Sequence, residues 1–329
     1  MEENRIFAFD IDGTLLGYNA EVKRNMDKLF QAIFKKYKNP QIMFVSGGDT
    51  LKVDRSVKIM EKVAGVDLSS AIQVSHSGGY IRGENNKTYR EDFFFKPDLV
   101  QKIINEIFSV DKYFYVVFCT SEGCFFPNYL LNDPTGDWLS VEVTKDIMYK
   151  VGNGFVADVA SNEQIRALVN ENKIRSILAL NPKKEFNEIA GERIRKYIAE
   201  FPQMGVASGS VIDLTASTKV SAIEAVLKEQ KSRVVFFGDS QNDIEALTKG
   251  TTGEYLGGVA LGNDIETLKS AELALPYMND FGIAYALGEL TDNSVCEIEV
   301  DGKIHKIKGK TKEETIKLAK EFTLKISQK

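Results

Sequence analysis

Short apolar runs recur along the first quarter of the chain and again near residue 235. They occupy residues 6–9, 42–45, 71–74 and 234–237, and they are nearly continuous rather than alternating with polar residues. Continuous apolar runs of this length are typical of strands that are buried on both faces, as in a parallel sheet. Each run leads directly into polar or glycine-rich residues. The pattern therefore predicts strands of a parallel sheet whose carboxyl ends meet polar loops.

Amphipathic segments lie between these runs. In the clearest one, over residues 22–37, apolar residues recur at spacings of three and four. This spacing predicts a helix with one buried face. Strands that alternate with helices indicate an α/β fold with crossover helices, in which ligands bind outside the carboxyl ends of the strands. We expect a Rossmann-like parallel-sheet core, with functional residues directly after the strands.

The pattern changes after residue 81. A polar stretch at 82–87 precedes an aromatic run at 93–95, and a helix is expected to open at Pro97. The following segment has its own helices and strands, and the first pattern returns with a helix near Thr218. We therefore expect a second α/β domain inserted into the first. The predicted core comprises residues 1–83 and 213–329, and the predicted insertion comprises residues 84–212.

The C-terminal segment predicts a hairpin followed by a helix. Two alternating runs, 295–300 and 303–307, are joined by an Asp-Gly pair that is typical of a tight turn. Thr311 and Glu314 have the spacing of a capping box, which marks the start of a helix. The pattern leaves open whether this segment packs on the core or serves a partner.

Composition and charge narrow the function classes. Hydrophobic residues make up 43% of the chain and charged residues 27%, which are ordinary globular values. The 42 Lys and Arg residues against 47 Asp and Glu residues leave a net charge of −5, a sign that disfavours binding to nucleic acid or to an anionic membrane. No segment has the pattern of a signal peptide or a membrane span. These values leave an enzyme that acts on a small molecule or a protein-binding module.

The cysteines indicate a reducing compartment. Cys119, Cys124 and Cys296 form an odd, sparse set without a CxxC spacing. Such a set does not build a disulfide framework. We expect reduced thiols in a cytoplasmic protein.

Acidic residues gather where two of the predicted strands end. Asp10 and Asp12 follow the first run, and Asp239 and Asp243 follow the run 234–237. Two carboxylates about 5 Å apart repel by about 3 kcal/mol at an effective dielectric constant of about 20. Such a cluster needs a cation or raised pKa values, and Mg²⁺ with its preference for oxygen ligands is the simplest cation.

A second strand end supplies groups suited to phosphate. Ser46 and Gly47 follow the run 42–45 and offer a hydroxyl and an approachable backbone N–H. Hydroxyl and N–H donors at the same edge as the acids favour a phosphate ester as the ligand.

Each motif also has an alternative interpretation. Asp-x-Asp-Gly can be an ordinary turn after a strand. A calcium-binding EF-hand is excluded, because the sixth loop position is Leu15 instead of glycine and a strand precedes the loop. Gly152, Gly154 and Ala157 match a dinucleotide-binding fingerprint, but the residues after them predict a strand and not the required helix. We interpret that segment as a glycine-rich turn.

The order and spacing of these motifs resemble the haloacid dehalogenase (HAD) superfamily of phosphatases, specifically its Cof-type branch with a class IIB cap. Residues 9–15 look like the first family motif, 45–47 like the second, Lys219 like the third and 238–243 like the fourth. Residues 259–263 and 271–274 resemble further stretches that are typical of the branch. The resemblance extends over residues 5–290 and identifies the inserted domain with the cap.

The resemblance implies a Mg²⁺-dependent phosphomonoester hydrolase with an aspartyl-phosphate intermediate. Asp10 would be the nucleophile, and Asp12 would protonate the leaving oxygen and later activate water. Lys219 would balance the charge on the transferring phosphoryl group. The implied substrate is a small phosphorylated metabolite such as a sugar phosphate.

The resemblance also implies the binding residues. Mg²⁺ would be held by the Asp10 side chain, the Asp12 backbone carbonyl and Asp239, with Asp243 supporting them. The phosphate would be held by Ser46, Gly47, Lys219 and Asn242.

Other functions and two departures stay open at this point. The same motifs permit a phosphotransferase or phosphomutase, or a non-catalytic protein that binds a phosphoester. The acid pair Asp10 and Asp12 argues against the last, because a pure sensor gains nothing from a general acid. Gly48 stands where the branch often has arginine, and Ser77 where many members have asparagine, so the usual substrate range is not transferred.

Two further features are expected to be structural. His76 follows a predicted strand, and we expect it to be hydrogen-bonded within the fold instead of contacting substrate. The aromatic residues of the predicted cap are expected to be mostly core residues, although a few could stack on a substrate. These aromatic residues are Phe93, Phe94, Phe95, Tyr113, Phe114, Tyr115, Phe125, Phe126, Tyr129 and Trp138.

Overall fold

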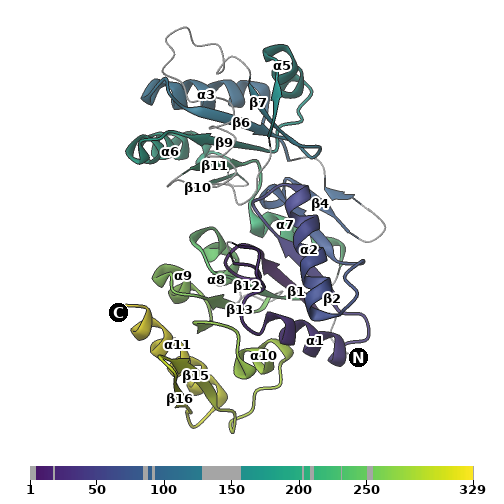
Figure 1. Cartoon of the computed structure of the whole chain (residues 1–329), viewed down its shortest axis with the longest axis vertical. Coiled ribbons are helices and arrows are strands. Elements are labelled where there is room, and N and C mark those ends of the chain that lie inside the picture. The colour runs from purple at the N-terminus through teal and green to yellow at the C-terminus, as the bar shows by residue number, and fades with distance from the viewer. Residues whose placement is uncertain are drawn as a thin grey trace.

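The computed structural model describes residues 5–328 except 18, 84–87, 91–92, 128–156, 202–203, 208–210, 231 and 250–254. The described residues form two lobes, each built around a β-sheet, and both ends of the chain lie in the lower lobe of Figure 1. The segment 152–156, interpreted above as a glycine-rich turn, lies outside the described residues.

The lower lobe is built on an eight-stranded sheet with the order β14-β13-β12-β1-β2-β3-β4-β5. The first six strands are parallel to one another, and β4 and β5 add an antiparallel edge. The strands are β1 (Arg5–Asp10), β2 (Gln41–Val45), β3 (Ile72–Ser75), β4 (Tyr80–Arg82), β5 (Thr88–Arg90), β12 (Arg233–Gly238), β13 (Tyr255–Leu261) and β14 (Leu273–Leu275). The predicted parallel-sheet core is therefore confirmed.

Helices cover both faces of this sheet. They are α1 (Met26–Lys36), α2 (Thr50–Ala64), α7 (Lys219–Glu229), α8 (Ile244–Thr248), α9 (Ile265–Ser270), α10 (Asp280–Leu287) and α11 (Lys312–Ser327), with the short 3₁₀ turns η1 (His76–Gly78) and η4 (Gln241–Asp243). In β1, Phe7 and Phe9 join one hydrophobic cluster and Ile6 and Ala8 the other. Successive side chains of a strand point to opposite faces, so a strand buried on both faces is continuously apolar.

One helix is shorter than the pattern predicts. The apolar spacing extends over residues 22–37, but α1 begins at Met26. Asn25 has a φ of 62°, a left-handed conformation that a right-handed helix cannot contain. The side chains before Asn25 belong to the turn that follows β1.

The upper lobe contains a six-stranded sheet with the order β10-β11-β9-β6-β7-β8. Its strands are β6 (Tyr115–Cys119), β7 (Cys124–Pro127), β8 (Ala157–Ala160), β9 (Ser176–Leu180), β10 (Gly205–Ala207) and β11 (Ile212–Thr215), and its helices are α3 (Pro97–Val110), α5 (Asn162–Asn170) and α6 (Lys184–Ile198). Side chains from these helices pack with the sheet in one hydrophobic cluster. The division of the chain at 83/84 and 212/213 stays a prediction: β5, at 88–90, pairs with the larger sheet and β11, at 212–215, with the smaller.

Four of the ten aromatic residues named above belong to the interior of the upper lobe. Phe95, Phe114, Tyr115 and Phe126 are buried in its hydrophobic clusters. Tyr129 and Trp138 lie outside the described residues. The expectation of core positions is confirmed for the four buried residues.

The C-terminal segment packs on the lower lobe. The hairpin β15 (Cys296–Val300) and β16 (Lys303–Ile307) turns at Asp301 and Gly302, whose φ angles of 50° and 74° are those of a type I′ turn. The Thr311 side chain accepts a hydrogen bond from the backbone N–H of Glu314 and so caps α11, as the sequence predicts. Ile298 is fully buried in the same cluster as Phe7.

Within the described ranges, no helix has both the length and the apolar character that a membrane span requires.

Two isoleucines of the hairpin test this packing. Ile298 is fully buried, whereas Ile304, on the paired strand, is 62% exposed. We expect Ile298→Ala to lower the free energy of unfolding by about 2–4 kcal/mol, because it leaves a cavity. Ile304→Ala should cost less than about 1 kcal/mol. Chemical denaturation of both variants measures the difference, and equal costs would show that the hairpin does not pack on the core.

Candidate active site

The candidate site lies where β1, β2 and β12 end. Strand register places Asp10 beside Val45 and Phe9 beside Phe237. Residues that follow these strands therefore emerge side by side at the carboxyl edge of the sheet. This is the edge where open α/β sheets bind ligands.

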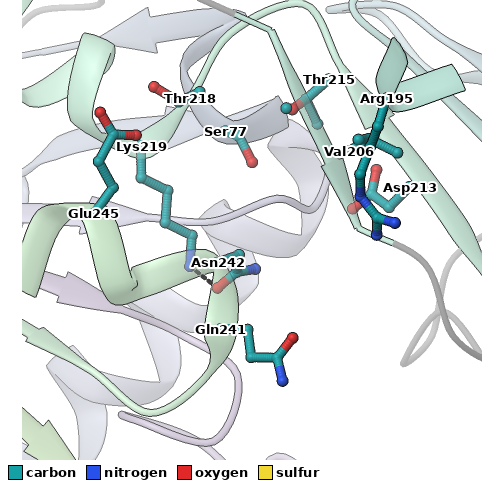
Figure 2. Close-up of a pocket in the computed structure, with 11 residues that line it drawn as sticks. Ser77, Arg195, Val206, Asp213, Thr215, Thr218, Lys219, Gln241, Asn242 and Glu245 are labelled. Carbon is teal, nitrogen blue, oxygen red and sulfur yellow. Dashed lines mark hydrogen bonds between the residues drawn. The ribbon is translucent and has the colours of Figure 1, made fainter. Parts of the chain in front are cut away.

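Lys219, the first residue of α7, links the end of β1 to the turn after β12 at this edge. Its ammonium donates to the Asp10 carboxylate and to Asp243 Oδ1 at 2.8 Å. It also donates to Asn242 Oδ1 at 3.2 Å (Figure 2). The side chains of Lys219, Asp10 and Asp243 are almost completely buried. The structure thus brings together residues from strand ends that are more than 200 positions apart in the chain.

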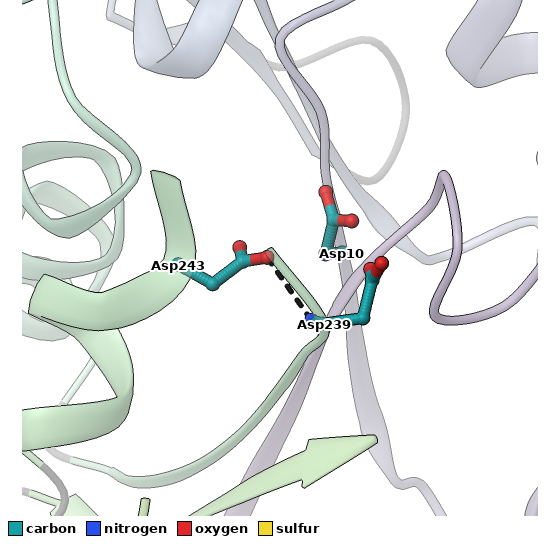
Figure 3. A group of neighbouring side chains, drawn as sticks. All are labelled: Asp10, Asp239 and Asp243. Atoms are coloured by element: carbon teal, nitrogen blue, oxygen red, sulfur yellow. Dashed lines mark hydrogen bonds between the residues drawn. The ribbon is translucent and has the colours of Figure 1, made fainter. Parts of the chain in front are cut away.

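Three carboxylates surround this single ammonium. Oxygen atoms of Asp10, Asp239 and Asp243 all lie within 4.8 Å of one another (Figure 3). Burial, together with the nearby Asp243, raises the pKa of Asp10 well above its usual value, although Lys219 opposes this shift. Burial also raises the pKa of Asp239 to about 6, against the hydrogen bond from Thr14 Oγ1 to Asp239 Oδ1 at 2.7 Å.

The electrostatics of this cluster fit a divalent cation. Burial lowers the pKa of Lys219, but Asp10 and Asp243 hold it above its usual value, so Lys219 carries one positive charge. Buried carboxylates that outnumber the cations beside them are destabilised by incomplete charge compensation. The available donors are carboxylate oxygens, which hard cations such as Mg²⁺ prefer.

Asp243 uses both of its oxygens within the protein. Oδ1 accepts from Lys219, and Oδ2 accepts from the backbone N–H groups of Asp239 at 3.2 Å and Ser240 at 3.1 Å. Figure 3 shows the bond to the backbone of Asp239. Asp243 therefore anchors the turn after β12 and orients Asp239. Its support of a bound Mg²⁺ stays a prediction.

Gly13, in the turn after β1, leaves room for the Asp239 carboxylate. Gly13 has a φ of 84°, and a Cβ at this position would lie 2.0 Å from Asp239 Oδ2. A side chain at Gly13 would thus be strained and would also displace the carboxylate. The Asp-Gly turn considered above is present, and it packs against the second acid-bearing strand end.

The Asp12 side chain points elsewhere. Its Oδ2 forms an ion pair of 2.6 Å with Lys52 Nζ, and the carboxylate is partly exposed. Lys52 lies in the first turn of α2 and was not identified from the sequence. A Cβ at Gly48 would lie 2.6 Å from Lys52 Cδ, so the glycine leaves space for the lysine to reach Asp12.

The predicted phosphate-binding residues surround the same edge. Ser46 is buried, and its Oγ accepts from the backbone N–H of Gly48 at 3.0 Å. Asn242 Oδ1 accepts from Ser240 Oγ at 2.8 Å in addition to Lys219. These bonds hold both side chains in place, and their contact with phosphate stays a prediction.

A pocket of about 390 Å³ lies between the two lobes above Lys219. This is a usual volume for a small-molecule site. The described residues that line it are Ser77, Arg195, Gly205, Val206, Asp213, Thr215, Thr218, Lys219, Gln241, Asn242 and Glu245 (Figure 2). None of these is aromatic, so the described wall of the pocket suits a polar ligand.

Comparison with known proteins identifies the family. Residues 7–287 match the family described as haloacid dehalogenase-like hydrolases. The chain belongs to this family. The predicted superfamily is therefore confirmed, and the chain is an enzyme of the hydrolase class. No curated protein matches the chain.

Solved structures share the fold of this HAD-like hydrolase at low sequence identity. A HAD subclass IIB sugar phosphatase has a TM-score of 0.61 at 16% identity, covering 86% of this chain and 98% of that chain. A protein from Thermotoga maritima has a TM-score of 0.62 at 16% identity, over 88% and 98% of the two chains. A HAD/Cof-like hydrolase from Plasmodium vivax has a TM-score of 0.63 at 13% identity, over 88% and 96%.

Direct hydrogen bonds join the two lobes of the HAD-like hydrolase. His76 Nδ1 lies 3.0 Å from Ser176 Oγ, and Arg175 donates to the backbone carbonyl of Gly79 at 3.2 Å. Thr50 Oγ1 donates to the carbonyl of Ser121 at 3.3 Å. Burial lowers the pKa of His76 to about 4, which keeps the ring neutral at pH 7. His76 is therefore hydrogen-bonded within the fold, as expected.

The pocket residues missed by the sequence analysis include Arg195, Asp213, Gln241 and Glu245. Asp213 has one available signal, because it is the polar position between two apolar positions of a strand. Gln241 lies in the stretch 238–243 that resembles the fourth family motif, but no role was assigned to it. Arg195 and Glu245 have no motif and reach the site only through the packing of α6 and α8.

The buried Asp213 of the HAD-like hydrolase gives a pH-dependent stability. Burial raises its pKa from 3.8 to about 6, against the fields of Lys52 and Lys219. The folded state thus binds a proton that the unfolded state releases. The contribution of this proton to the free energy of unfolding is full below pH 4 and is lost as the pH rises through 6. We expect Asp213→Asn to gain stability over the wild type by on the order of 1–3 kcal/mol between these values. Unfolding curves across this range measure it, and parallel profiles would contradict it.

Proposed function

We propose that this chain is a Mg²⁺-dependent phosphatase that hydrolyses phosphomonoesters of small polar metabolites. The observation that carries this proposal is the buried Asp10 carboxylate, which is held by Lys219 beside Asp239 and Asp243. A polar pocket adjoins this cluster through Lys219, which lines the pocket and donates to Asp10. The family assignment and the fold shared with a sugar phosphatase support the same activity.

Asp10 and Asp12 have different roles in the proposed reaction. The Asp10 carboxylate attacks phosphorus, and the bond from phosphorus to the leaving oxygen breaks as the aspartyl-phosphate forms. Asp12, two residues on, must leave its ion pair with Lys52 and turn toward the ester to give its proton to the leaving oxygen. It then takes a proton from the water that attacks phosphorus, and the bond to Asp10 breaks with release of inorganic phosphate.

The surrounding residues stabilise the charge. Lys219 neutralises part of the negative charge that spreads over the phosphoryl oxygens in the transition state. Ser46 and Asn242 orient those oxygens. The side chains of Asp10 and Asp239 and the Asp12 carbonyl would hold a Mg²⁺ ion, which would supply further positive charge beside the phosphoryl group. Asp243 acts through the turn that it anchors.

The nucleophile is tested with Asp10→Asn, which has nearly the same shape but is a poor nucleophile. We expect kcat for p-nitrophenyl phosphate in the presence of Mg²⁺ to fall by about 10⁴-fold or more. The exposed Asp67 serves as a control, and Asp67→Asn should retain activity. The release of free phosphate is measured, which also separates hydrolysis from phosphoryl transfer.

Retained turnover in Asp10→Asn, or full activity of the wild type in excess chelator, would contradict the proposed function. Tight binding of phosphoesters without turnover would favour a binding protein.

Metal binding is tested independently of turnover. A ligand that binds only the folded state at 100 times its Kd stabilises that state by about 2.7 kcal/mol. We expect Mg²⁺ to raise the Tm of the wild type, because it relieves repulsion among the buried carboxylates. Asp239→Asn should lose most of this shift, while Asp67→Asn retains it. Equal shifts in the wild type and in Asp239→Asn would place the ion elsewhere.

A further inference from the structure

Asp213 presents a charged side chain to the pocket from the upper lobe. It lies in β11, where Ile212 and Leu214 are fully buried in the hydrophobic cluster of that lobe. Since successive side chains of a strand alternate, Asp213 is directed to the opposite face, where it lines the pocket (Figure 2). The fold therefore places this carboxylate in the wall of the pocket that also contains Lys219.

One oxygen of Asp213 lacks a partner inside the described structure. Oδ1 is buried and has no hydrogen-bond partner among the described residues. Buried acceptors are nearly always hydrogen-bonded, because leaving one unpaired costs its full desolvation. An unpaired acceptor in the wall of a pocket indicates that its partner is a group on the ligand.

The position of Asp213 identifies the part of the ligand that it faces. A Cβ at Gly47 would lie 3.4 Å from Asp213 Oδ2, so the carboxylate is adjacent to the predicted phosphate-binding turn. A carboxylate repels phosphoryl oxygens, so it does not bind the phosphate itself. It therefore faces a group of the leaving portion close to the ester oxygen.

The two lysines whose fields act on Asp213 are already engaged. Lys52 is paired with Asp12 at 2.6 Å, and Lys219 with Asp10 and Asp243. Neither lysine is hydrogen-bonded to Asp213 Oδ1. The pairing of these cations elsewhere leaves the carboxylate available to a hydrogen-bond donor on the ligand.

We propose that Asp213 is a specificity-determining residue that accepts a hydrogen bond from a hydroxyl or ammonium group on the leaving portion of the substrate. This inference rests on the proposed phosphatase function. It predicts preference for esters that carry such a donor near the phosphate over esters that carry none. A site that contains a buried acceptor discriminates strongly, because a substrate without the donor leaves the acceptor unpaired.

The test compares two kinds of ester in the full-length protein. One is the best substrate among hexose, pentose, amino-sugar and glycerol phosphates, and the other is p-nitrophenyl phosphate, which has no donor. We expect Asp213→Ala to lower kcat/KM about 10- to 100-fold for the first and to change it by less than about threefold for the second. Asp213→Asn, which keeps an acceptor oxygen and the side-chain volume, should show a smaller loss than Asp213→Ala.

Deoxy analogues of the best substrate identify the donor. The wild type should hydrolyse the analogue that lacks the donor more slowly than the parent substrate, whereas Asp213→Ala should hydrolyse both equally well. The loss from removing the donor and the loss from removing the carboxylate are then not additive. Equal losses for both esters in both variants would show a structural role and overturn the inference. Unchanged values for both esters would overturn it as well. If the wild type hydrolyses p-nitrophenyl phosphate but the Asp213 variants do not differ in their preference between the two esters, this inference alone is refuted. If the wild type hydrolyses no ester, the proposed function and this inference are refuted together.

Discussion

The ion pairs of Lys219 with Asp10 and Asp243 are the interaction on which the site depends. They join the end of β1 to the turn after β12 through the first residue of α7, and all three side chains are buried. Without the ammonium, the buried carboxylates of Asp10 and Asp243 would lie beside the partly buried Asp239 without this cation, a strongly destabilising arrangement. The same pairs hold Asp10 in place and, through Asp243, orient the turn that carries Asp239. Stability of this edge and its proposed chemistry therefore share one set of contacts.

A short segment of chain leads from the smaller sheet of the upper lobe to Lys219. Strand β11 ends at Thr215 and α7 begins at Lys219. Asp213 and Lys219 thus lie on either side of the chain's return from the smaller sheet, and both line the pocket. The hydrogen bond between His76 and Ser176 and the one that Arg175 donates to Gly79 also join the lobes. The residue proposed to select the leaving group and the lysine proposed to stabilise the phosphoryl group therefore lie six positions apart in the chain.

Much of the core could be predicted, because strands buried on both faces must be apolar throughout. The strands at 6–9, 42–45 and 234–237 were predicted for this reason, and the acids after them were expected to meet. Strand β13 was missed as a strand, because Gly257 and Gly258 interrupt its apolar run. A Cβ at Gly258 would lie 2.5 Å from the backbone of Leu247, so this glycine is required by a contact that exists only after folding.

The sequence by itself determined the parallel-sheet core, the acids at its carboxyl edge and the hairpin and helix of the tail, because these follow from local apolar spacing, turn residues and caps. The tertiary structure alone decided which partner each charge takes. Lys52 pairs with Asp12, while Asp243 anchors a turn and Asp213 faces the pocket from the other lobe. The physical reason is that charge pairing and burial depend on distances between segments far apart in the chain, and those distances exist only when the two sheets have packed.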